Sequence, residues 1–338
     1  MAQHMKYYYE LTISCSPHVH GKTTTRTIMR DVIIALLPAL VGSVYFFGLR
    51  TLVVTLISVA SCVFFEWAWC RLMKQPSKVY DLSAVVTGML LAFVCPVTIP
   101  YWIIVIGALF AIVVVKMLFG GIGKNVVNPA LAARAFLFSW PAAMSTWIPV
   151  GWENRAGILF SADAAAVDAF TAATPMENLH AGVMPEASLL DMFLGNVGGS
   201  FGETSAALLL IGFLYLLIRK VLTPRIPVAY LGTVALLAFL FPMGNQRLPW
   251  VAAQLCGGGL MLGALFMATD YVTSPVTKLG QVIYGIGCGV LTVMIRYFGS
   301  YNEGVSYAIL IMNICVVLLD RIGRPTKFGA PKKGAAGK

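Results

Sequence analysis

Two short polar stretches stand out among long apolar runs as places where this sequence could carry chemistry. The first contains Asp168, Thr171, Ala172, Ala173 and Thr174, followed directly by a proline. A hydroxyl beside small residues is accessible enough to form a phosphoester. The alternative is an exposed turn in which the Thr-Pro pair ends a short helix, because the residue before a proline disfavours the α conformation. Both interpretations remain open from the residues alone.

The second stretch reads Asn125-Val-Val-Asn128-Pro129 and precedes an apolar run. Asn128 before a proline is typical of the first residues of a helix, so a capping role is expected. Exposed donors at a helix start also suit a polar ligand. A cap and a ligand contact are therefore compatible at this position.

Carboxylates near the apolar runs are candidates for ion coupling, since acids inside a membrane are costly and usually functional. Glu203 and Asp270 are the strongest candidates because each lies within a motif rather than a loop. For Asp320 a local ion pair with Arg321 or Arg324 is the simpler expectation. The alternative for most of the others is a solvated or capping role at the end of a span; these are Asp31, Glu66, Asp81 and Glu303.

The remaining residue types predict neither a metal site nor a catalytic group of this chain's own. The seven cysteines form no C-x-x-C pair, and the four histidines lie outside the apolar runs. Glycine clusters at 120–123, 198–202 and 257–259 match no phosphate-binding fingerprint. Close packing of membrane helices is the expected use of these glycines.

The composition indicates the class of protein that must position these residues. Of 338 residues, 59% are hydrophobic and 11% are charged, whereas soluble domains carry about a quarter charged residues. This excludes a soluble enzyme, a disordered chain and a secreted disulfide scaffold. The net charge of +10 is expected to lie on cytoplasmic loops. No basic patch with exposed aromatics predicts nucleic-acid binding.

The apolar runs predict an all-α polytopic membrane protein with about ten transmembrane helices. The third run is short and ends at Cys95-Pro96, and the fifth is interrupted by Pro141. Short or interrupted spans tend to mark binding regions. The ten runs are 32–49, 51–70, 82–95, 100–119, 128–146, 204–222, 226–243, 249–269, 279–298 and 304–320.

The distribution of cations predicts the orientation. With a cytoplasmic N-terminus, nineteen of the 24 Lys and Arg fall on the inner side, so both termini are expected in the cytoplasm. The predicted parts are a cytoplasmic segment (1–30), a first five-helix half (31–146), an extracytoplasmic loop (147–203), a second half (204–320) and a basic tail (321–338). Two units with an odd number of spans must be inverted if they are repeats.

From about Ser16 to Asp320 the chain resembles the D subunits (RnfD) of the Rnf complex, the membrane-bound ferredoxin–NAD oxidoreductase. It is similar, more distantly, to the B subunits (NqrB) of the sodium-pumping NADH–quinone reductase. The resemblance depends on several stretches together, and any one alone would be unspecific. These are residues 16–18, 28–39, 120–136, 195–205, 266–275 and 301–304.

The resemblance implies two flavins. In that family the last Thr of a Ser/Thr-x-Ala-Thr motif carries FMN through a phosphoester, which implies covalent FMN on Thr174. Many members have Gly where this chain has Ala172. The Asn-x-x-Asn pattern implies a second, non-covalent riboflavin near Asn125 and Asn128. The glycines at 198–202 follow the flavin loop and could approach the ring.

The resemblance also implies a redox subunit of an ion-pumping complex in the bacterial cytoplasmic (inner) membrane, with electron transfer through the flavins coupled to Na⁺ or H⁺ movement. The implied partners are the covalent-FMN protein RnfG, the membrane proteins RnfA and RnfE, the NADH-binding flavoprotein RnfC and the iron–sulfur protein RnfB. The alternatives are an NqrB-like protein, although its N-terminal extension is longer, a small-solute channel or transporter, or a structural scaffold.

Overall fold

The computed structural model describes residues 23–76, 79–147, 174–244, 246–299, 301 and 303–322, and these residues contain helices and no strand. The predicted site residues Thr171, Ala172 and Ala173 lie outside this part. The helices of the first group are α2 (Thr25–Phe47), α3 (Arg50–Leu72), η1 (Val79–Asp81), α4 (Ser83–Phe93), α5 (Tyr101–Leu109), η2 (Phe110–Met117), α6 (Pro129–Leu137) and α7 (Pro141–Met144). Those that follow are α9 (Pro175–His180), α10 (Leu189–Leu194), α11 (Ala206–Ile218), α12 (Arg225–Leu240), α13 (Arg247–Cys256), α14 (Leu260–Leu262), η3 (Gly263–Met267), α15 (Lys278–Phe298) and α16 (Val305–Ile322).

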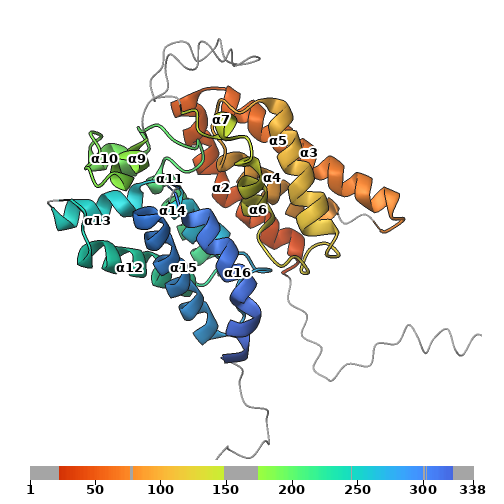
Figure 1. Cartoon of the computed structure of the whole chain (residues 1–338). Helices are drawn as coiled ribbons and strands as arrows, with labels where there is room; N and C mark the ends of the chain where they lie inside the picture. Colours follow the sequence, from red (N-terminus) through yellow and green to blue (C-terminus); the bar gives the residue numbers. More distant parts are fainter. Residues whose placement is uncertain are drawn as a thin grey trace, which may run out of the picture.

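The helices gather into two groups that lie side by side (Figure 1). In the first, α3 packs on α4 and α5, and in the second α12 packs on α13 and α15. The groups meet where α2 packs on α11 and α6 packs on α16. The short helices α9 and α10 lie at one end of the second group, beside α13 (Figure 1).

Each of the ten predicted spans overlaps one helix or two to three consecutive helices. Four of them are long and apolar enough to cross a membrane: α2, α3, α15 and α16. A fifth results if α13 and the segment Leu260–Met267, which meet at an angle of 66°, count as one span. Four further apolar helices in the described part are shorter, namely α4, the pair α5–η2, α11 and α12. A polytopic membrane protein is therefore confirmed, while the number ten stays a prediction.

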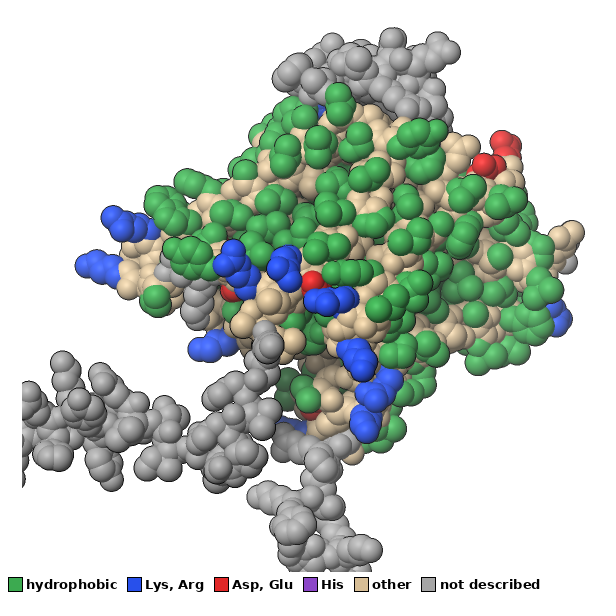
Figure 2. Space-filling view, turned by 180° about the vertical axis from the view of Figure 1, so that it is seen from behind, with side chains coloured by type: hydrophobic (Ala, Val, Ile, Leu, Met, Phe, Trp, Pro, Cys, Tyr) green, Lys and Arg blue, Asp and Glu red, His purple; other side chains and the backbone are tan. Residues whose placement is uncertain are grey.

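The outer surface suits a membrane. Figure 2 shows hydrophobic side chains over most of one face, with Lys and Arg gathered mainly in its lower part. Large apolar side chains at exposed positions come from helices of both groups, and this exposure would be costly in water. Examples are Val41, Leu56, Ile218, Leu236 and Ile314.

The eighth predicted span is broken, whereas the sequence predicted a continuous helix. Gly257, Gly258 and Gly259 separate α13 from α14, and Gly258 has φ +64°, a conformation that favours glycine. The expected close packing is present as well. A Cβ on Gly257 would lie 2.9 Å from the sulfur of Met176 in α9. The break therefore brings backbone groups against the segment that follows Thr174.

Two helix starts depend on local capping, and one of them differs from the prediction. Helix α2 begins at Thr25 rather than near residue 32, because Thr24 and Thr27 form a capping box. Helix α6 begins after Asn128, as predicted, and ends at Leu137 before the short helix at Pro141. The interruption of the fifth span by Pro141 is thus confirmed.

Candidate functional site

A cavity of about 280 Å³, called here the Thr174 cavity, lies where the two helix groups and the segment after Thr174 meet. One part of its wall carries charges, from Arg134, Glu203 and Glu303. Another part is aromatic or sulfur-containing and suits a flat ring. That part contains Phe138, Met144, Trp147, Met176, Met192, Cys256 and Tyr301.

Thr174 lies at the start of a helix, and the residues before it, where the alternative placed a helix ending at the Thr-Pro pair, lie outside the described residues. It is the N-cap of α9, with Pro175 at the first helical position, where a proline is well tolerated. Its hydroxyl makes no capping hydrogen bond, unlike those of Ser188 and Ser205, which cap α10 and α11. The side chain is half-buried and lines the cavity. The hydroxyl is therefore not needed by the helix.

Helix α9 is anchored by its apolar residues. Met176 and Leu179 are buried in a small cluster with Trp250 and Ala253 of α13. At the end of α9, Nδ1 of His180 lies 2.7 Å from the carbonyl oxygen of Arg296. The segment that carries Thr174 is thus fixed against the second helix group.

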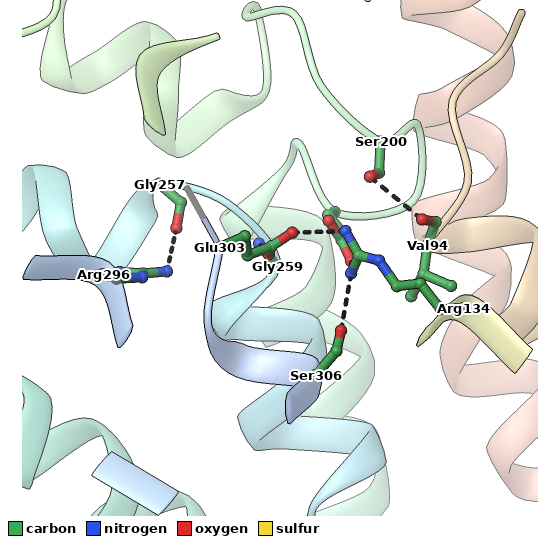
Figure 3. A network of polar contacts seen from close by, with 9 residues as sticks. Val94, Arg134, Ser200, Gly257, Gly259, Arg296, Glu303 and Ser306 are labelled. Atoms are coloured by element: carbon green, nitrogen blue, oxygen red, sulfur yellow. Dashed lines mark hydrogen bonds and ion pairs between the residues drawn. The ribbon is translucent and has the colours of Figure 1, made fainter. Parts of the chain in front are cut away.

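Arg134 joins three segments of the chain at the cavity wall (Figure 3). It donates to Glu203 at 2.7 Å and to Glu303 at 2.5 Å, and its hydrogen bond to the hydroxyl of Ser306 is 3.3 Å. Glu303 also accepts a hydrogen bond from the backbone N–H of Gly259. Arg134 and Glu203 are almost fully buried. One guanidinium therefore holds two carboxylates of the second helix group against the first.

Two glycines of the 198–202 cluster lie at the Thr174 cavity. Gly198 and Gly199 line it, and Ser200 donates to the carbonyl of Val94 at 3.5 Å (Figure 3). A Cβ on Gly202 would collide with Phe93. The turn before α11 therefore depends on glycine to approach α4 and to place Glu203 beside Arg134.

A second cavity, called here the Asn128 cavity, has a volume of about 80 Å³. Its wall is rich in polar groups from both helix groups. Because Arg134 follows Asn128 by six residues, α6 carries the chain about 9 Å from one cavity to the other. The polar lining residues are Ser83, Thr87, Lys116, Asn125, Asn128, Thr269 and Asp270.

The two asparagines predicted from the sequence have unequal roles. The side-chain oxygen of Asn128 accepts from the N–H of Ala130 at 3.0 Å, and its amide donates to the carbonyl of Met267 at 3.3 Å. The capping role is confirmed, and the same side chain joins the two helix groups. Asn125 makes one local bond, to the carbonyl of Val127 at 3.2 Å.

Asp270, the other acid proposed for ion coupling, lies at the Asn128 cavity and not beside Glu203. Thr273 donates to its carboxylate at 3.1 Å. On the same wall, Nζ of Lys116 lies 2.6 Å from Glu66 and 2.6 Å from the hydroxyl of Ser83. The structure thus separates the two candidate acids into different cavities.

Several buried cations were misassigned by the sequence, which counted them as loop charges. Arg50, Lys116, Arg134 and Arg296 each expose 3% or less. Arg50 donates to carbonyls after α4, and Arg296 donates to carbonyls at the break after α13. The available signal was a lone cation within or beside an apolar run, where burial requires a partner.

Asp320 makes contacts that the sequence did not predict, and Arg324, one of its two predicted partners, lies outside the described residues. Its carboxylate accepts from the backbone N–H of Val276 at 3.0 Å and of Thr277 at 3.2 Å. Among the described residues it makes no ion pair with Arg321. Asp320 therefore ties the end of α16 to the start of α15.

Comparison with known proteins identifies the family of this chain. The sequence model of the NQR2, RnfD, RnfE family matches residues 12–329. The chain belongs to this family. Among members of the family, the D subunit of the Na⁺-translocating ferredoxin:NAD⁺ oxidoreductase complex of Acetobacterium woodii is 47% identical over 95% of this chain and 96% of its own length.

Two further relatives in the family are similar over nearly their full lengths. The D subunit of the proton-translocating ferredoxin:NAD⁺ oxidoreductase complex of Clostridium ljungdahlii is 39% identical over 94% of this chain and 96% of its own length. The D subunit of an ion-translocating oxidoreductase complex of Stutzerimonas stutzeri is 40% identical over 93% of this chain and 94% of its own length. The names of these relatives include both sodium and proton translocation, so similarity alone does not fix the ion.

Proposed function

We propose that this chain is the D-type membrane component of an ion-translocating ferredoxin:NAD⁺ oxidoreductase complex and that it carries FMN on Thr174 through a phosphoester. The observation that supports this most is the position of Thr174, at a cavity lined by aromatic side chains and by Arg134. Its hydroxyl is free of the capping role that comparable Ser residues fill. The flavin, when bound, supplies the redox chemistry, and the protein supplies placement and electrostatics.

The Thr174 cavity fits such a group. Its volume of about 280 Å³ is close to the lower end of the range for ligand pockets, roughly 300–1,000 Å³. Phe138 and Tyr301 offer apolar faces for a planar ring, and Arg134 offers a positive charge. Gly198 and Gly199 let the backbone approach an occupant closely, since they carry no side chain into the cavity.

The second flavin, a riboflavin, is proposed for the Asn128 cavity. Asn125 and Asp270 provide polar groups that suit the edge of a neutral ring. The volume of about 80 Å³ is well below the usual range of ligand pockets, roughly 300–1,000 Å³, so side chains there must move apart to admit the ring. Extraction of the unfolded protein tests this, because covalently bound FMN stays on the chain: release of about one riboflavin per chain supports the proposal, and an extract without riboflavin contradicts it.

For the architecture, we propose ten spans in two inverted five-helix repeats, with both termini cytoplasmic in a bacterial inner membrane. The equivalent first helices α2 and α11 pack on each other, as do the equivalent last helices α6 and α16. Such like-with-like contacts are expected across a pseudo-two-fold axis. Burial of Arg50, Arg134 and Arg296 leaves fewer surface cations on the proposed outer side.

The partners proposed are the other proteins of the complex, RnfG, RnfA, RnfE, RnfC and RnfB, together with membrane lipid. Electron transfer through the flavins is coupled in this proposal to Na⁺ or H⁺ movement, with Glu203 and Asp270 as candidate coupling residues. Each of these carboxylates lines a cavity proposed to hold a flavin. A change in the charge of that flavin would therefore change the electrostatic energy of the carboxylate.

The proposal is tested by in-gel flavin fluorescence of the full chain, expressed in membranes with a flavin transferase. Wild type is compared with Thr174→Ala, with Thr171→Ala from the same motif, and with Thr204→Ala, whose side chain lines the same cavity. We expect a fluorescent band that only Thr174→Ala abolishes, because the phosphoester needs that hydroxyl.

Two results would contradict the assignment. A fluorescent band in Thr174→Ala places the flavin elsewhere. A dark wild-type band, with the transferase active on a control substrate, removes the covalent flavin and favours the transporter alternative.

A further inference from the structure

The charged part of the Thr174 cavity wall consists of one guanidinium, that of Arg134, and two carboxylates, those of Glu203 and Glu303. A second guanidinium, that of Arg296, lies beside Gly257 and does not line the cavity (Figure 3). Arg296 is held by the carbonyls of Gln254 at 2.6 Å and Gly257 at 3.0 Å, at the break after α13. The other titratable side chains nearby are those of Cys95, Tyr230, Cys256, Tyr301 and Tyr307.

Arg134 nevertheless has a donor to spare. Its two terminal nitrogens bind Glu203 and Glu303, but Nε is buried without a hydrogen-bond partner among the residues that the structure describes. A buried donor left unsatisfied costs about 1–3 kcal/mol. Because Arg134 exposes only 3% of its surface and lines the cavity, an acceptor atom brought by an occupant would satisfy Nε.

We infer that Arg134 donates through Nε to an oxygen of the redox-active ring in the Thr174 cavity and stabilises the negative charge that the ring gains on reduction. This inference rests on the proposed function, because it takes a flavin as the occupant. Glu203 and Glu303 act as positioning residues: they fix the guanidinium so that it faces the cavity without reorganising when charge develops. In a site of low dielectric such a fixed donor has a strong effect.

The direction in which a substitution shifts the reduction potential of the flavin distinguishes an electrostatic role of the charged residue from a purely structural one. Loss of the guanidinium charge should make reduction less favourable, and loss of a carboxylate charge should make it more favourable. Damage to the fold has no reason to shift the potential in opposite directions at neighbouring residues. Glu303 is the better acid for this purpose, because a glutamine there can still accept from the N–H of Gly259.

The experiment is a spectroelectrochemical titration of the flavin on the full chain, purified from membranes with the transferase co-expressed. The variants are Arg134→Gln, Arg134→Lys and Glu303→Gln, and Thr174-linked flavin is quantified in each by in-gel fluorescence. The matched control is Arg219→Gln. Arg219 also pairs with an acid of the other helix group, Asp31 at 3.2 Å, but does not line the Thr174 cavity.

We expect Arg134→Gln to weaken the preference for the reduced ring at least tenfold, a fall in midpoint potential of about 59 mV for one electron. Arg134→Lys should lower the midpoint potential less, Glu303→Gln should raise the midpoint potential, and Arg219→Gln should leave it unchanged. Unchanged potentials, or shifts of one sign in Arg134→Lys and Glu303→Gln, would overturn the inference. These two variants decide the question if Arg134→Gln fails to fold.

Failure of the proposed function has a different signature. If wild type carries no flavin at Thr174, the proposed function is wrong and this inference is wrong with it. If wild type and variants carry equal flavin but show equal potentials, the proposed function stands and only the role of Arg134 is wrong.

Discussion

The two buried charge clusters of this protein differ in ways that suggest different uses. In the Asn128 cavity, Lys116 meets one carboxylate, Glu66, and the hydroxyl of Ser83 completes its contacts within the first helix group. In the Thr174 cavity, Arg134 meets two carboxylates that both come from the second helix group or its leading loop. The first cluster is a closed pair, and the second is a clamp between halves with an unused donor.

The difference shows what each cluster can contribute. A closed ion pair in an apolar interior contributes little net stability, because desolvation offsets the attraction, but it becomes costly when one partner is removed. The clamp has the same cost, and in addition Nε of Arg134 at the cavity wall has no hydrogen-bond partner among the described residues. Chemistry is therefore expected at the clamp, and a structural role at the pair.

The largest effect is expected for Arg134→Met, which leaves the buried carboxylate of Glu203 and the partly buried carboxylate of Glu303 without this cation. Removal of one partner from a buried pair costs about 3–5 kcal/mol, and here two partners are affected. The measurement is thermal unfolding of the detergent-solubilised chain, with Arg219→Met as the control, because half of the Arg219 side chain is exposed. Equal melting temperatures for the two variants would mean that the clamp does not hold the halves together.

The next effect is expected for Lys116→Met, about 3–5 kcal/mol by the same reasoning. The double variant Lys116→Met/Glu66→Gln should recover most of this loss, because it leaves no unpaired charge from this pair. Flavin fluorescence at Thr174 should persist in both, since neither residue lines that cavity. If the double variant is as unstable as the single one, the pair does more than balance charge.

This comparison also shows how far the sequence could go. Hydrophobic runs predicted an all-helical polytopic membrane protein, because the length of an apolar run is a local property of the sequence. Thr174 and Glu203 were proposed from their motifs, and the structure places both at one cavity. The partnership of Arg134 with Glu203 and Glu303 spans 69 and 169 residues, and no local pattern encodes such pairs.

The break at Gly257–Gly259 was missed for a related physical reason. Glycine clusters serve both for close helix packing and for positive φ, and the sequence alone does not separate the two uses. The burial of Arg50 and Arg296 was missed because a cation at the end of an apolar run is typical of a loop. The backbone carbonyls that accept from these two arginines lie just after the ends of α4 and α13, and the sequence does not show that they approach the arginines.

The smallest effect is expected at the two asparagines beside the closed pair, where Asn128→Ala should exceed Asn125→Ala. Asn128 caps α6 and also reaches Met267 in the second helix group, and loss of an N-cap costs about 1 kcal/mol. Asn125 makes only a local bond to Val127 among the contacts described. Thermal unfolding of the two variants in one detergent measures the difference.

If Asn125→Ala lowers stability as much as Asn128→Ala, the loss of the helix cap does not explain the loss of stability in Asn128→Ala. If instead Asn125→Ala is stable but loses non-covalent riboflavin, its role is in binding, and the Asn128 cavity then carries chemistry as the Thr174 cavity does.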